Sequence, residues 1–203
     1  MKQEIKTLKL YITEALHINK NTKTQTYNYH PKTNDELQEL IRKLIKERGN
    51  DADLNDIDTS EITDMSSVFY NSEFNGDISE WDVSNVKDMN AMFMGSKFNG
   101  DISEWNVSDV TDMTGVFYKS EFNRDISEWD VSNVKDMSYM FMGSKFNKDI
   151  SAWNVGAVEN MSSMFQDSKF NGDISDWDVS NIKNVTNMFI DCPLQKNPPK
   201  WYK

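Results

Sequence analysis

Few residues of this 203-residue chain are of the types that carry out catalysis. There are two histidines, His17 and His30, and both precede the repeated part of the sequence. The single cysteine, Cys192, has no histidine close to it in the sequence. A nucleophile normally needs a base beside it, and phosphate chemistry normally uses a Gly-rich loop, which is missing here. We therefore expect a protein that is not an enzyme and that needs no cofactor or catalytic metal.

Aspartates recur at a step of 24 residues, and carboxylates at a regular spacing could bind calcium. These corner aspartates are Asp77, Asp101, Asp125, Asp149 and Asp173. No loop of the DxDxDG type occurs, which favours the alternative that each carboxylate accepts hydrogen bonds from nearby backbone N–H groups. A second series is expected to form a ladder of side-chain amides at the same corner: Asn75, Asn99, Asn123, Asn147 and Asn171.

A further set of polar residues is the candidate binding surface. One row alternates Asp and Asn at an outward position of each unit, and the neighbouring row is mostly glutamate. The alternation separates like charges and so reduces their repulsion. This acidic strip consists of Glu80, Asp82, Glu104, Asn106, Glu128, Asp130, Asn154, Asp176 and Asp178. A face that binds a protein and a solvated face without a partner both fit this pattern.

The strip and the corner residues belong to a repeated unit, of which Phe74–Lys97 is the clearest copy. Its landmark tryptophans are Trp81, Trp105, Trp129, Trp153 and Trp177. A fixed period between 20 and 50 residues is typical of a solenoid. Within a unit, alternation predicts a short parallel strand at about Glu80–Val83, with Trp81 pointing inward. A short helical turn is expected from Asp88 to Phe93. The predicted fold is an α/β repeat whose core contains the tryptophans.

The residues before the repeats predict a short strand at Leu8–Ile12 and then a helix. Thr33 and Glu36 have the spacing of a capping box, and Gly49 supplies a stop. Between them lies one apolar stripe, formed by Leu37, Leu40, Ile41, Leu44 and Ile45. We assign residues 1–50 to an N-terminal segment whose helix caps the open end of the repeats.

Residues 51–191 form the repeat region, with a degenerate unit at 51–73 and five units from residue 74. Residues 192–203 are the predicted C-terminal cap. This segment lacks backbone donors at three prolines and is a poor template for another strand: Pro193, Pro198 and Pro199.

The net charge of -11 and the pI near 4.6 argue against binding to nucleic acid or to an anionic membrane surface. No apolar run is long enough to span a bilayer. The first 20 residues also lack the pattern of a signal peptide. These features predict a cytoplasmic protein, or a surface or secreted protein if another export route is used.

The unit FNGDISEWDVSNVKDMNAMF resembles the bacterial surface-protein repeat of the DUF285 family. Val86–Phe93 is similar to the V-T-x-I-x-x-x-A-F segment of BspA-type leucine-rich repeats, and the likeness extends over about Pro31–Lys203. The resemblance implies a right-handed, leucine-rich-repeat-like solenoid. Some BspA-type members are linked to adhesion to host matrix proteins, and the family supplies no catalytic motif.

The leading hypothesis is a non-enzymatic module, with a host-interaction or adhesion-like role, that offers the acidic strip on its sheet face to a protein. The alternative is a structural or self-associating protein with no external ligand. The sequence leaves open the partner, the oligomeric state and the role of residues 1–30.

Overall fold

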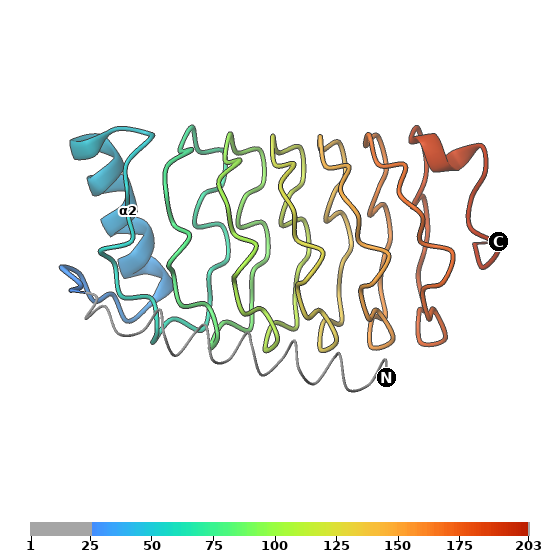
Figure 1. Ribbon diagram of the computed structural model, residues 1–203, viewed down its shortest axis with the longest axis horizontal. Coiled ribbons are helices and arrows are strands. Elements are labelled where there is room, and N and C mark those ends of the chain that lie inside the picture. Colours follow the sequence, from blue (N-terminus) through green and yellow to red (C-terminus); the bar gives the residue numbers. More distant parts are fainter. Residues whose placement is uncertain (1–25, 203) are drawn as a thin grey trace, which may run out of the picture.

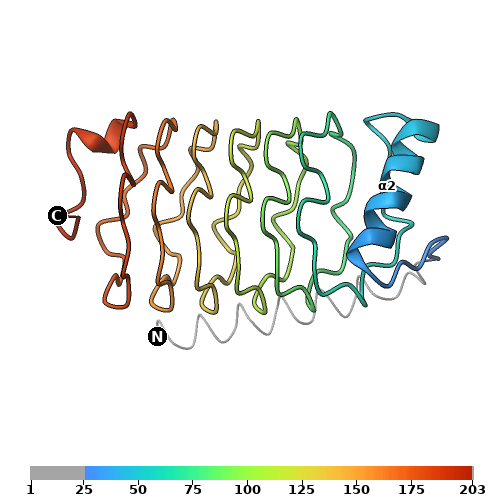
Figure 2. The same ribbon diagram turned by 180° about the vertical axis from the view of Figure 1, so that it is seen from behind.

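The computed structural model describes residues 26–202. Apart from α2 (Asn34–Arg48) and the short 3-10 helix η1 (Pro193–Gln195), the chain winds through coils of 24 residues. Isolated parallel bridges join equivalent residues of neighbouring coils, such as Asp88 to Asp112 and Asp112 to Asp136. The coils lie side by side along the long axis, with α2 at one end and the C-terminal segment at the other (Figures 1 and 2).

The prediction of an α/β solenoid with a strand in each unit is wrong. The described residues contain isolated bridges and no strand, so there is no sheet. At the predicted strand, the N–H of Trp81 donates to the carbonyl of Ile78 (3.2 Å), and the N–H of Val86 donates to that of Val83 (3.0 Å). These bonds close tight turns within the coil. Amides used in this way cannot pair with a neighbouring strand.

The predicted helical turn at Asp88–Phe93 is also wrong. The N–H of Met92 donates to the carbonyl of Met89 (3.1 Å), but the N–H groups of Ala91 and Phe93 donate to carbonyls of the next coil. Backbone angles are left-handed at Ala91 (φ 54°) and Gly95 (φ 67°), as in a series of type II turns. A helix would bond every amide within its own segment, whereas here alternate amides hold two coils together. The units are therefore not the strand–helix units of a leucine-rich-repeat-like solenoid.

The expected inward position of the tryptophans is confirmed. Trp81, Trp105, Trp129 and Trp153 are each 4% exposed, and the rings of Trp81 and Trp105 stack nearly parallel with centroids 6.4 Å apart. Each indole Nε1 also donates to a backbone carbonyl of the preceding coil, as Trp129 does to Ile102 (3.0 Å). A buried carbonyl needs such a partner, so this ladder fixes the register between coils as well as filling the core.

Helix α2 begins and ends where the sequence predicts. The Thr33 side chain accepts the N–H of Glu36, and Gly49 ends the helix. The helix covers the first coil with three buried side chains: Leu37, Ile41 and Leu44. Its Asn34 and Gln38 amides donate to the backbone carbonyl of Ser66 (2.9 and 3.1 Å). The strand predicted at Leu8–Ile12 lies outside the described residues.

The other end of the stack is covered in part by the residues that follow Cys192. Trp201 extends the indole ladder, since its Nε1 donates to the carbonyl of Ile174 (3.0 Å). The ring of Tyr202 meets that of Phe189 edge-on, with centroids 4.7 Å apart. The terminal segment thus packs on one part of the last coil.

Candidate functional site

The acidic strip lies on the surface. All nine of its residues are exposed, and they recur at the same positions of successive coils: Glu80, Asp82, Glu104, Asn106, Glu128, Asp130, Asn154, Asp176 and Asp178. They project from the turns that replace the predicted strand, so the strip is a row of turn residues and not the face of a sheet.

One row of the strip also stabilises the fold, which the sequence analysis missed. Oδ1 of Asp130 accepts the backbone N–H of Ser132 (3.0 Å). Asp82 and Asp178 likewise each accept the N–H of the serine two residues later. Hydrogen bonds from Ser180 hold the pKa of Asp178 below its usual value. Asn106 replaces the carboxylate with an amide oxygen and still accepts the N–H of Ser108 (3.2 Å). The Asp and Asn alternation is therefore neutral for turn geometry and changes only the charge.

The glutamate row is not used in this way. Within residues 26–202 the carboxylates of Glu104 and Glu128 make no hydrogen bond and no ion pair, and both side chains are exposed. The series is interrupted at Ala152, which also faces solvent. Pairing of Glu104 or Glu128 with an outside group would therefore break no bond of the fold described by residues 26–202.

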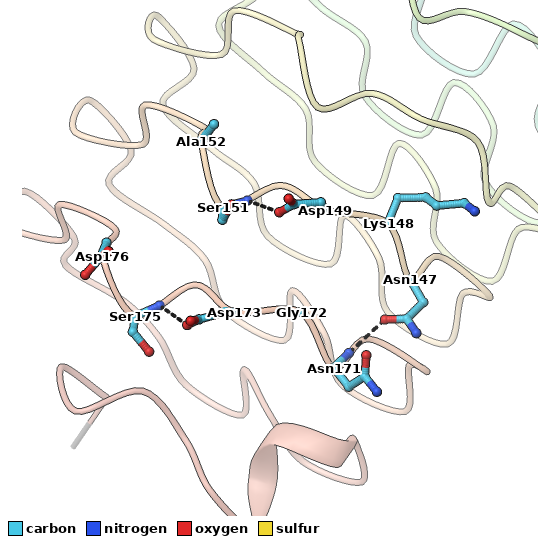
Figure 3. A pocket seen from close by; sticks show the side chains of 10 residues that line it. All are labelled: Asn147, Lys148, Asp149, Ser151, Ala152, Asn171, Gly172, Asp173, Ser175 and Asp176. Carbon is cyan, nitrogen blue, oxygen red and sulfur yellow. Dashed lines mark hydrogen bonds between the residues drawn. The ribbon is translucent and has the colours of Figure 1, made fainter. Parts of the chain in front are cut away.

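A hollow lies at this interruption, between two successive coils (Figure 3). It is lined by Ala152, by Asp176 of the strip, and by the corner residues Asp149 and Asp173. The backbone N–H groups of Ser151 and Ser175 bond these two corner carboxylates and keep their pKa values below the usual range. The hollow is therefore lined by ionised oxygens, with Lys148 at its edge. Its charge suits a cationic side chain.

The corner aspartates act as the sequence analysis favoured. Asp101 and Asp125, like the others, each accept the N–H of the serine two residues later (3.0 Å). The asparagine ladder is confirmed as well, because the Oδ1 of Asn99 accepts the N–H of Asn123 in the next coil (2.9 Å). Among residues 26–202, no three acidic, histidine or cysteine side chains are grouped as a metal site requires.

A column of carboxylates, three of them half-buried and the first exposed, was not recognised in the sequence as a stacked set. These stacked aspartates are Asp64, Asp88, Asp112 and Asp136, the bridge residues of four coils. Burial, and then the charges of Asp112 and Asp64, raise the pKa of Asp88. At the two ends, the Asn34 amide donates to Asp64 (3.0 Å) and the Asn160 amide to Asp136 (2.9 Å). The two end carboxylates of the column thus accept hydrogen bonds from amides, whereas Asp88 lies between two carboxylates whose like charges repel it.

The catalytic residue types are dispersed. The Cys192 thiol is buried, and burial raises its pKa, which disfavours the reactive thiolate. Nδ1 of His30 lies 3.1 Å from Oδ2 of Asp58 near the start of the stack. His17 is outside the described residues.

No helix among residues 26–202 is long and apolar enough to cross a membrane. Comparison with the curated proteins and with the solved structures found no match. A family model described as "Mycoplasma protein of unknown function, DUF285" matches residues 36–144 and again 96–201, two overlapping segments that together take in α2 and the coils. The chain belongs to the DUF285 family.

Proposed function

We propose that this protein is a non-enzymatic protein-binding module that holds a basic surface of its partner on the acidic strip. The observation that carries the proposal is the glutamate row. Glu104 and Glu128 are exposed, stand at equivalent positions of successive coils and have no partner within the described chain. Regularly spaced free carboxylates on a rigid stack form an extended recognition surface, as in other repeat proteins.

The negative charge of the strip favours a partner with a positively charged surface. Exposed opposite charges attract by about 1 kcal/mol at 4 Å in water, so single pairs contribute little and a row of them steers encounter and orientation. The hollow beside Ala152 adds a specific contact, because an inserted lysine or arginine would meet Asp149, Asp173 and Asp176 together. The preferred ligand is a protein segment with several Lys or Arg residues.

The resemblance to BspA-type repeats gives this binding a biological setting. Some of those proteins are linked to adhesion to host matrix proteins, and an adhesion-like or host-interaction role is the one we propose here. Such a role requires display on the cell surface or secretion.

The test captures partners from host-cell extract and from the lysate of the source organism. The test variant is Glu104→Lys with Glu128→Lys, which reverses two strip charges that make no bond within the described part of the chain. Asp130→Lys is avoided because it would also break the bond to Ser132. The control is Glu39→Lys with Glu47→Lys, two exposed residues of α2 that give the same charge change away from the strip.

A protein held by the wild type and by the α2 control, and lost from the strip variant, is the expected result. Equal capture by all three forms would refute the strip as the binding surface. No captured protein from either extract would favour the alternative of a structural protein without an external ligand.

The hollow is tested separately by Ala152→Glu, which restores the glutamate that Glu128 provides one coil earlier. The added side chain fills the hollow while making the strip more acidic. Weaker binding therefore indicates insertion of a partner side chain, and stronger binding indicates attraction by the row of charges alone.

A further inference from the structure

One row of turns, which contains Met113, Met137 and Met161 at equivalent positions, joins its coils by backbone hydrogen bonds that run in one direction. The N–H of Met161 donates to the carbonyl of Asn184 in the next coil (2.8 Å), and the N–H of Ser163 donates to that of Thr186 (2.8 Å). The same donor-to-acceptor order joins Met137 to Asn160 and Met113 to Asp136 in earlier coils. In this row each coil therefore presents donors toward the C-terminal end of the stack and acceptors toward the N-terminal end. The direction reverses just before the row, where the N–H of Lys183 donates to the carbonyl of Glu159 in the preceding coil (2.7 Å).

The last coil has donors without acceptors. One coil after Met161 and Ser163 stand Val185 and Asn187, whose N–H groups donate to no described residue. The inward side chains around them are only partly buried, namely Val179, Ile182 and Val185. Their counterparts one coil earlier are at most 1% exposed: Val155, Val158 and Met161. This end thus has an apolar surface whose backbone donors have no partner among residues 26–202.

The terminal segment leaves this part of the coil uncovered. Trp201 bonds to Ile174, and Tyr202 packs on Phe189, so both lie on the other part. The chain turns at η1 at the top of the last coil, and the segment that follows runs down beside this coil without reaching its lower end (Figure 1). Further along the last coil, the N–H of Asp191, which is equivalent to the inter-coil donor Asp167, is taken up by Oε1 of Gln195 (3.0 Å).

The direction of the hydrogen bonds decides what can cover this surface. A second copy placed end to end in the opposite sense would set donors against donors. A second copy stacked head to tail would meet α2, whose Asn34 and Gln38 amides already occupy the acceptor at Ser66. What fits is an extended segment with free carbonyl groups at alternate residues and apolar side chains on one side, in the manner of backbone-mediated peptide addition.

We propose that the uncovered part of the C-terminal end, formed by Val179, Ile182, Val185 and Asn187, binds an extended segment of another polypeptide. Carbonyl oxygens of that segment accept the N–H groups of Val185 and Asn187. Its apolar side chains cover Val179 and Ile182, as the next coil does elsewhere in the stack. This site is separate from the acidic strip and independent of the function proposed for it.

The test uses the full chain and a synthetic peptide with the sequence of residues 179–188, which is the segment that covers the equivalent donors of the preceding coil. Amide hydrogen exchange is followed by NMR. In the free protein, Val185 and Asn187 should exchange fast, while Met161 and Ser163 exchange slowly. The peptide should slow exchange at Val185 and Asn187, and a scrambled peptide of the same composition should not.

Two variants check the location of binding. Ile182→Lys should weaken peptide binding about tenfold or more, since it removes a covered apolar side chain. Tyr70→Lys makes a similar change at an exposed position on the side of the stack and should leave binding unchanged. The Glu104→Lys, Glu128→Lys variant should bind the peptide normally, which separates this site from the strip.

Unchanged exchange at Val185 and Asn187 with saturating peptide would overturn the proposal. Slow exchange of both amides in the free protein, together with a dimer in sedimentation, would overturn it too and assign the surface to a second copy.

Discussion

Replacement of one stacked aspartate, Asp88→Asn, should stabilise the protein. The asparagine Oδ1 can keep the bond from the N–H of Asn90 (2.7 Å), while the charge that faces Asp64 and Asp112 is removed. The new amide can also donate to a neighbouring carboxylate, as the natural Asn160 does to Asp136 (2.9 Å). The substitution therefore keeps the turn and relieves the repulsion.

The expected gain in the free energy of unfolding is about 1–2 kcal/mol. Two like charges on adjacent coils repel by about 1 kcal/mol at 4 Å in water, and solvent screening of this half-exposed group keeps the sum near that figure. One added hydrogen bond contributes about 0.5–1.5 kcal/mol. For a chain of this size each kcal/mol raises Tm by about 2–4 °C. Urea unfolding and calorimetry measure both quantities.

The pH dependence of this gain in stability tests whether relief of charge repulsion is its cause. Because the pKa of Asp88 is raised in the folded state, its ionised form lowers stability above that pKa. The advantage of Asp88→Asn should therefore be complete at neutral pH, fade as the pH falls through the raised pKa of Asp88, and be lost below the usual pKa of aspartate. A gain that is unchanged at low pH would refute electrostatic repulsion as the reason.

Asp125→Asn is the matched control, with the same change of charge in another column. The N–H of Ser127 lowers the pKa of Asp125, so its ionised form favours folding. This contribution is present above the usual pKa of aspartate and is lost as the pH falls through the lowered value. Asp125→Asn should therefore lower stability at neutral pH. Equal effects of the two variants would contradict the account of both columns.

Three further results are expected. Trp129→Phe should lower the free energy of unfolding by about 1–3 kcal/mol in urea, because the carbonyl of Ile102 loses its indole donor; no loss would contradict the role of the ladder. Gly95→Ala should cost about 1–2 kcal/mol by the same measurement, since φ is 67° and the new Cβ would stand 2.1 Å from Oδ1 of Asn71; wild-type stability would refute this. Calcium or a chelator should leave Tm unchanged in calorimetry, because the corner aspartates bond backbone amides; a calcium-dependent rise would contradict that assignment.

The buried tryptophan core and the helix at the start of the stack could be predicted from the sequence, because they depend on residue types at fixed spacings. A tryptophan at every 24th position has to be buried somewhere, and Thr33, Glu36 and Gly49 specify a helix without reference to the rest of the fold. The exposed positions of Glu104 and Glu128 follow from the same periodicity.

The conformation of the backbone could not be predicted from the sequence. Alternate amides bond to carbonyls of the next coil, and no local sequence pattern indicates such bonds. Ala91 and Tyr139 have left-handed φ angles of 54° and 60°, which their residue types do not suggest. Glycines gave a signal for these left-handed turns, namely Gly115 at the equivalent position of the coil between them, and Gly95 and Gly143 four residues after Ala91 and Tyr139. The structural bonds of Asp82 and Asp130 were missed for a related reason, since a predicted strand leaves such side chains without a turn to bond.

The central claim is that free carboxylates of the strip bind a basic protein. The most direct measurement is the Kd of the captured partner, as a function of salt, for the wild type, for Glu104→Gln with Glu128→Gln, and for Glu39→Gln with Glu47→Gln. The account predicts that the strip variant binds more weakly and depends less on salt, whereas the α2 variant matches the wild type. Identical affinities and identical salt dependence for all three proteins would contradict it.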